Sequence, residues 1–131
     1  MKGFVDDIEE RTKGNKEFRR VLYTGQHLQL VVMALKPGME IGEEVHADHD
    51  QFFRIEKGRG EVWIDGERTK VRREDAILVP AGAKHNVVNT GEKALKFYTI
   101  YGPPEHKDGV VRATKAHAEL PEEPFDGATT E

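Results

Sequence analysis

The sequence predicts an all-β protein, a sandwich or barrel of short antiparallel strands. Three observations support this prediction: apolar segments of about four to eight residues, turn signals roughly every eight to twelve residues between them, and only one short stretch with a helical pattern. The chain has 131 residues, which is enough for one domain around one hydrophobic core. Hydrophobic residues make up 37% and charged residues 34%, as is typical of a globular domain with a well-charged surface.

The predicted strands follow one another through the middle of the chain. We expect them at 20–23, 28–35, 51–56, 60–64, 67–71, 76–79, 85–89 and 94–101. Asp65-Gly66 predicts a two-residue type I′ hairpin, because both residues tolerate a positive φ. Breaks are expected at Pro37-Gly38 and at Pro80-Ala81-Gly82, where proline and glycine interrupt regular structure. The one predicted helix is short and covers 113–120.

These elements predict a central β-barrel over residues 20–112, flanked by two extensions. Residues 1–19 are mostly charged and have few large apolar side chains, which predicts an irregular N-terminal arm that orders partly by packing. Residues 113–131 end in an acidic, proline-containing stretch, which predicts a loose C-terminal tail.

Two long strands are apolar on both faces. In 28–35, Leu30 and Val32 alternate with Val31 and Met33, and 94–101 has the same character. A two-layer sandwich buries only one face of each strand, so the second face needs a cover. We expect a homodimer that packs these faces together. The alternative is that the N-terminal arm folds back over its own barrel.

Composition and charge exclude several classes of protein. There are 20 Lys and Arg against 24 Asp and Glu, a net charge of −4, so we expect no nucleic-acid partner. No apolar run approaches the roughly 20 residues of a membrane helix, so no membrane partner is expected either. Cysteine is absent, which excludes disulfides, thiolate metal sites and a cysteine nucleophile. The N-terminus turns acidic before any apolar signal segment forms, and a cytoplasmic location is predicted.

Four polar side chains lie at strand ends, where we expect them to face inward. Glu44 and His46 are two residues apart on an extended stretch and therefore share a face. Gln51 begins a strand on which the next residue of the same face, Phe53, is apolar, and His85 begins a later strand. Unpaired polar groups in a core cost several kcal/mol. Binding of a divalent metal ion would satisfy these polar groups and so explain why they are buried together.

The spacing of these residues resembles the two sequence motifs of the cupin superfamily. The first motif is Gly, five residues, His-x-His, three or four residues, Glu, six residues and Gly. Residues 38–58 match it with Gly38, Glu44-Val45-His46, Gln51 and Gly58. The second is Gly, five residues, Pro-x-Gly, two residues, His, three residues and Asn, and residues 74–89 match it with Glu74, Pro80-Ala81-Gly82, His85 and Asn89.

This resemblance covers about residues 28–101. The chain is similar to small single-domain cupins of type 2, the group labelled mannose-6-phosphate-isomerase-like. It implies a double-stranded β-helix, the jelly-roll barrel of that superfamily, with short irregular extensions at both ends. It also implies one divalent metal ion, Fe, Mn, Ni or Zn, with Glu44, His46, Gln51 and His85 as ligands.

Two of these four positions depart from the cupin pattern. Glu44 replaces the first ligand histidine, and Gln51 replaces the ligand glutamate. Together the two replacements keep one negative charge among four ligands, as a retained metal site would. Two histidines and a carboxylate suit divalent iron, manganese, nickel or zinc equally. The alternative is a metal-free network in which Gln51 hydrogen-bonds Glu44 or a histidine.

The resemblance leaves the reaction open. We expect a small metal-binding cupin that acts on a small organic substrate by dioxygenase or sugar isomerase or epimerase chemistry. Glu44 or a metal-bound water would then move the proton. The alternative is a binding or sensor module without turnover. A sugar phosphate is disfavoured because no glycine-rich phosphate loop precedes a helix. His49 is expected at the surface or rim.

Overall fold

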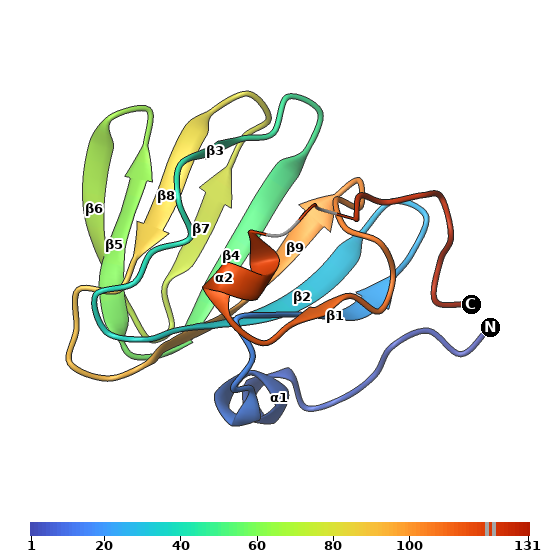
Figure 1. The fold of residues 1–131 in the computed structure, drawn as a ribbon, viewed down its shortest axis with the longest axis horizontal. Coiled ribbons are helices and arrows are strands. Elements are labelled where there is room, and N and C mark those ends of the chain that lie inside the picture. The colour runs from blue at the N-terminus through green and yellow to red at the C-terminus, as the bar shows by residue number, and fades with distance from the viewer. Residues whose placement is uncertain (120, 122) are drawn as a thin grey trace.

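The computed structural model of the chain describes residues 1–119, 121 and 123–131. Within them, two antiparallel sheets face each other and a short helix lies near each end of the chain (Figure 1). The strands are β1 (Arg19–Thr24), β2 (Gln29–Leu35), β3 (Glu44–Val45), β4 (Asp50–Lys57), β5 (Arg59–Ile64), β6 (Glu67–Arg72), β7 (Ala76–Val79), β8 (Lys84–Val88), β9 (Leu95–Gly102) and β10 (Val111–Arg112). The helices are α1 (Ile8–Gly14) and α2 (Lys115–Ala118). The predicted all-β class is confirmed.

The strands form one sheet of six and one of four. The larger sheet has the order β10-β1-β2-β9-β4-β7, and the smaller has the order β3-β8-β5-β6. Each strand expected from the sequence is present within one or two residues of its predicted bounds. The two-residue strands β3 and β10 were not predicted, because two residues are too few to show an alternating pattern.

The hydrophobic core lies between the two sheets. Phe53 of β4 and Phe97 of β9 are fully buried and contact each other edge to face, with ring centroids 5.6 Å apart. Val31, Met33 and Leu35 all face the core from β2. These alternating inward residues fix the register of each strand, because a slip of one residue would expose them.

In two turns, residues adopt a positive φ, and this conformation relates to the residue types found there. Asp65 and Gly66 both have positive φ, 48° and 83°, which confirms the predicted type I′ hairpin between β5 and β6. Glu74 has φ of 78° at the position where the cupin motif has glycine. A left-handed conformation is unfavourable for any residue with a Cβ atom, so this departure from the motif carries local strain.

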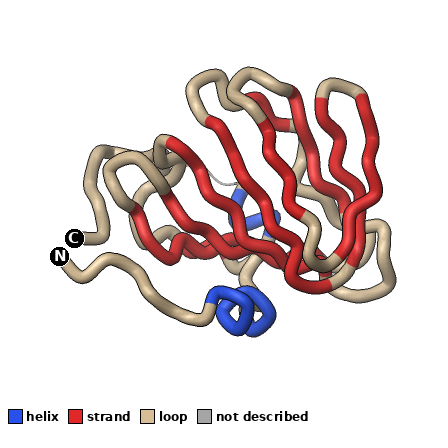
Figure 2. The backbone as a smooth tube through the Cα atoms, turned by 180° about the vertical axis from the view of Figure 1, so that it is seen from behind, coloured by secondary structure: helices blue, strands red, loops and turns tan. Residues whose placement is uncertain are grey.

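The N-terminal arm is partly ordered by packing against the larger sheet. It contains α1, which Asp7 caps by accepting a hydrogen bond of 3.0 Å from the backbone N–H of Glu10. The helix packs against β2, β4 and β9 on the outer side of the larger sheet (Figure 2). Val32, which points away from the core residue Val31, is only 1% exposed. The arm therefore covers part of the second apolar face.

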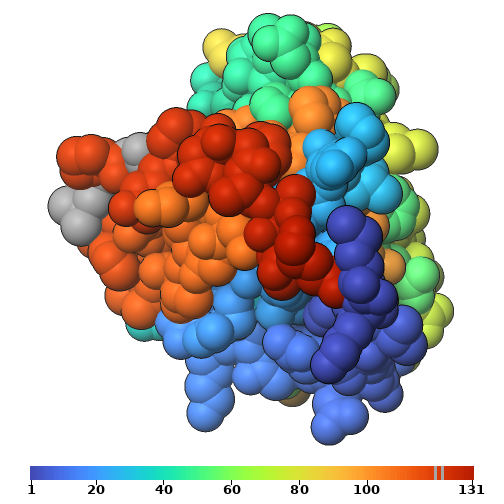
Figure 3. All heavy atoms as spheres, turned by 90° about the vertical axis from the view of Figure 1, so that its right-hand side faces the viewer, coloured from blue at the N-terminus to red at the C-terminus, as the bar shows by residue number. Residues whose placement is uncertain are grey.

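The two ends of the chain lie side by side (Figure 3). The Glu131 carboxylate accepts hydrogen bonds from the backbone N–H groups of Lys2 and Gly3 and from the Tyr23 hydroxyl. The predicted helix at 113–120 corresponds to α2, which Thr114 caps, while residue 120 lies outside the described residues. Neither α1 nor α2 has the length and apolar character that crossing a membrane requires.

Candidate metal centre

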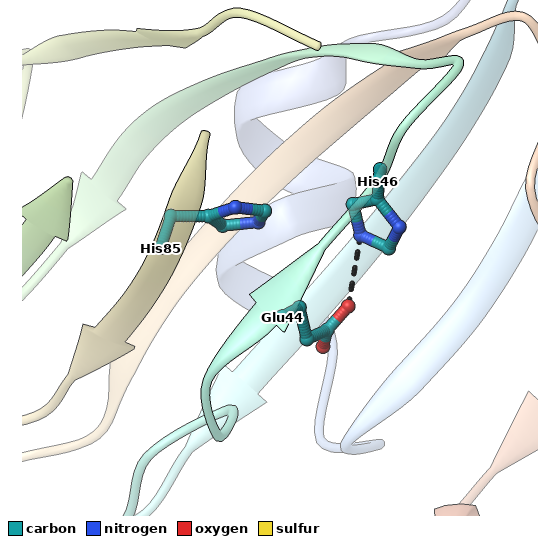
Figure 4. Close-up of side chains that lie close together, drawn as sticks. All are labelled: Glu44, His46 and His85. Carbon is teal, nitrogen blue, oxygen red and sulfur yellow. Dashed lines mark ion pairs between the residues drawn. The ribbon is translucent and has the colours of Figure 1, made fainter. Parts of the chain in front are cut away.

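The backbone brings three of the predicted metal ligands to one end of the sandwich. Glu44 belongs to β3, His46 follows directly after it, and His85 belongs to β8 (Figure 4). Glu44 and His85 are register partners in the β3–β8 pair. The short strand β3 is therefore what places the first motif beside the second.

The donor atoms of these residues converge. One ligand atom from each of Glu44, His46 and His85 lies within 4.8 Å of the other two. His46 Nε2 lies 2.9 Å from Glu44 Oε2 (Figure 4), and His85 Nε2 lies 3.2 Å from Gln51 Oε1. The structure thus brings together all four predicted site residues, and their role as metal ligands stays a prediction.

Buried neighbours orient the two donors that lie deepest, Gln51 and His85, which are 3% and 4% exposed. Gln51 Nε2 donates to Thr99 Oγ1 at 2.9 Å. His85 Nδ1 lies 3.1 Å from the carbonyl oxygen of Ala83, which can only accept, so we assign the ring proton to Nδ1. The Nε2 lone pair then faces Gln51 Oε1 at 3.2 Å, and two acceptors this close favour a cation that both can coordinate from one side.

The opposite orientation of the Gln51 amide gives the metal-free alternative. Its NH₂ group would then donate to His85 Nε2, and its oxygen would accept from the Thr99 hydroxyl. Both arrangements satisfy the buried groups. They differ in whether the site has a lone pair to offer a metal ion.

The Glu44 carboxyl is the acidic member of the cluster. Burial raises the pKa of this carboxyl, but the hydrogen bond with His46 and the electrostatic influence of His46, Arg19 and His85 together lower it by more. The net result is a pKa below the ordinary value of 4.5. Glu44 is therefore ionised at neutral pH, as a metal ligand must be.

Glu105 is a site residue that the sequence did not indicate. Its carboxylate lies 2.8 Å from His49 Nε2 and 3.7 Å from His46 Nδ1. His49 Nδ1 lies 2.6 Å from the carbonyl oxygen of Pro103, so His49 sits at the rim, as expected. Glu105 lies on the Nδ1 side of His46, whereas Glu44 contacts Nε2, so the two carboxylates flank the imidazole. Glu105 lies outside both motifs, in a segment without periodicity.

A pocket of about 390 Å³ opens beside Glu44 and His46. Arg19, Glu105, Lys115 and Glu119 also line it. Its residues come from four separate parts of the chain, and α2 contributes to its wall. Two of the four cluster residues, Glu44 and His46, therefore border a space of the size that small-molecule sites occupy.

Comparisons with known proteins identify the family. A sequence model described as the cupin domain matches residues 31–101. The Bacillus subtilis protein YrkC is 47% identical over 123 residues, covering 89% of this chain and 66% of its own length. A protein of Acanthamoeba polyphaga mimivirus is 38% identical over 113 residues, covering 82% of this chain and 70% of its own.

A solved structure agrees with this assignment. The crystal structure of BH2720 from Bacillus halodurans superimposes with a TM-score of 0.88 at 47% identity. The match covers 89% of this chain and 93% of that one. The family match, the facing antiparallel sheets and the motif residues at one end agree, and the chain belongs to the cupin family.

Proposed function

We propose that this cupin binds one divalent metal ion through Glu44, His46, Gln51 and His85 and acts on a small organic substrate in the adjacent pocket. The observation that supports this proposal is the convergence of three donor atoms within 4.8 Å, with Gln51 Oε1 3.2 Å from one of them. Two imidazoles, one carboxylate and one amide oxygen fit a divalent transition metal better than Ca²⁺ or Mg²⁺, which prefer oxygen ligands.

In such a site, the metal ion and the surrounding residues would have different chemical roles. A bound divalent ion would supply Lewis acidity or, if it is iron, reactivity towards O₂. Glu44 is ionised and borders the pocket, so its carboxylate can accept a proton from a substrate held there. The carbonyl oxygen of Ala83 orients the His85 ring through a hydrogen bond of 3.1 Å, and the Glu105 carboxylate lies 3.7 Å from His46 Nδ1. Both dioxygenase and isomerase or epimerase chemistry are compatible with these roles.

Metal analysis of protein purified without an affinity tag tests the proposal. We expect close to one equivalent of metal per chain, with strong loss in His85→Ala and full retention in His117→Ala, a histidine of α2 outside the cluster. Equal metal content in the two variants would contradict the site.

Activity separates an enzyme from a binding module. O₂ uptake by the metal-loaded protein with a panel of small metabolites would identify an oxygenase, and product isomers without O₂ uptake would identify an isomerase. Metal and ligand binding without turnover would support the alternative, a binding or sensor module.

We also propose a homodimer that packs through the outer face of the larger sheet. Phe52 and Leu78 are register partners in the β4–β7 pair, and Leu78 is 73% exposed, so α1 leaves this part of the face open. Trp63 is not part of this face, because it lies on β5 of the smaller sheet, where the Arg68 guanidinium lies over its ring at 4.2 Å. Light scattering should give about twice the chain mass of 14.8 kDa, and Leu78→Asp should lower it. A monomeric mass for the wild type would contradict the dimer.

A further inference from the structure

Arg19 is a buried cation whose Nε atom has no hydrogen-bond partner among the described residues. The residue is only 8% exposed. The guanidinium lies over the ring of Phe18, 5.3 Å from the centroid, and this contact satisfies none of its N–H donors. Leaving such a donor unpaired costs several kcal/mol, so a structural role alone does not explain the residue.

The strand β1 aims Arg19 at the site. Arg19 and Val21 are both buried and, by the alternation of a strand, point to the same side, where Val21 joins the core. Arg20 between them points to the other side and pairs with Glu17 at 3.4 Å. Arg19 lines the pocket together with Glu44 and His46. Among the described residues no salt bridge includes Arg19, although its charge lowers the pKa of Glu44. A cation therefore borders the pocket beside the candidate metal centre.

The charges around the pocket favour an anionic ligand once a metal is bound. Arg19 and Lys115 provide two positive charges, and Glu44, Glu105 and Glu119 provide three negative ones. Glu105 is already engaged by His49 at 2.8 Å. A divalent cation beside Glu44 reverses the sign of this balance, so the loaded pocket attracts negative charge.

We propose that Arg19 binds the carboxylate of a small organic acid whose other end reaches the metal centre. This inference rests on the proposed function and names its substrate class. A guanidinium presents a planar pair of N–H donors that matches a carboxylate, which lysine cannot do. The carboxylate would pair with the guanidinium where Arg19 lines the pocket, and the aromatic ring of Phe18 would hold the guanidinium plane in place.

Calorimetric titration of the Mn(II)-loaded protein with malonate tests the inference. We expect Arg19→Gln to weaken malonate binding about ten- to a hundredfold, the range for removing a charged hydrogen-bonding partner. Arg19→Lys should lose part of the affinity, because the charge remains and the paired donors do not. Arg20→Gln is the matched control, since it neutralises the next residue on the outer side. Malonamide, which is neutral, should bind the wild type weakly and be insensitive to Arg19.

Metal content measured on the same samples distinguishes a failure of the metal site from a failure of the carboxylate contact at Arg19. Wild-type levels of bound manganese in Arg19→Gln, with weakened malonate binding, support the inference. Malonate affinity that is equal in the wild type and Arg19→Gln overturns it while leaving the metal site intact. A wild-type protein that binds no metal overturns the proposed function and this inference with it.

Discussion

The two ends of the interior between the sheets differ in character although the same strands run through both. On β4, Gln51 faces inward at one end, and Phe53 and Ile55 face inward further along. On β8, His85 is followed two residues later by Val87, which is fully buried. The polar end holds the candidate metal centre, and the apolar end is filled with aromatic and aliphatic side chains.

This difference shows that one backbone pattern serves two purposes. Alternation alone places each of these side chains inside, and the residue type then decides whether the position stabilises the fold or serves a ligand. Apolar burial contributes directly to the free energy of unfolding. A buried polar group contributes only about 0.5–1.5 kcal/mol through a hydrogen bond that it makes, and it costs about 1–3 kcal/mol if it is left unpaired. Substitutions at the two ends should therefore separate stability from metal binding.

The largest effect is expected at the apolar end. Phe97→Ala removes a fully buried ring that contacts Phe53 and should lower the free energy of unfolding by about 3–5 kcal/mol, measured by urea denaturation. Tyr98→Ala, on the outward-facing and half-buried neighbour, should cost less. A loss below about 1 kcal/mol for Phe97→Ala would mean that the core is not as packed as described.

At the polar end, stability should depend on the metal. A metal ion at a hundred times its dissociation constant adds about 2.7 kcal/mol to the free energy of unfolding of a protein that binds it only when folded. The wild type should show this gain in thermal or urea unfolding, and His85→Ala should show none. An equal gain in both would place the metal elsewhere.

Gln51→Glu distinguishes the two orientations of the Gln51 amide. If the oxygen faces the metal position, a carboxylate there should raise metal affinity about tenfold or more, because it adds a negative charge to the donor set. In the metal-free protein the same change should cost about 1 kcal/mol or more, because it buries a charge. Unchanged metal affinity would favour the hydrogen-bonded, metal-free network.

Glu44 predicts a pH dependence of the metal-free protein. Because the pKa of Glu44 is below 4.5 in the folded state, its contribution is fully present above pH 4.5 and is lost as the pH falls through the folded pKa. Glu44→Gln should therefore be less stable than the wild type at pH 7, by about 1 kcal/mol, the usual contribution of a hydrogen bond. In chelator-treated samples, the difference in the free energy of unfolding between the wild type and Glu44→Gln should disappear in acid. If that difference instead grows as the pH falls below 4, the lowered pKa of Glu44 is contradicted.

The smallest effect is expected in the loop at the apolar end. Glu74 has positive φ, and its backbone N–H donates to the carbonyl oxygen of Ile55 at 2.7 Å. Glu74→Gly should stabilise the protein by about 0.5–1 kcal/mol, since glycine adopts this conformation without strain. Chemical denaturation measures the change, and metal affinity should not move. Destabilisation would mean that the flexibility of glycine in the unfolded chain outweighs the relieved strain.

Much of the fold was predictable because its signals are local. Strand alternation, the Asp65-Gly66 hairpin and the motif spacing each lie within a few residues of one another, and the structure confirms the strands and the hairpin. The helix α1 escaped prediction because a seven-residue charged helix shows little periodicity and depends on packing against the sheet. The cytoplasmic location and the absence of a nucleic-acid partner stay predictions.

The sequence by itself determined which residues face inward, because a strand has only two faces and its apolar positions mark one of them. For that reason Glu44, His46, Gln51 and His85 were identifiable as a group. The tertiary structure alone decided what surrounds them, because Arg19, Glu105 and Lys115 reach the same pocket from segments far apart in the chain. No spacing links such residues in the sequence, and only the pairing of the strands and the docking of α2 bring them together.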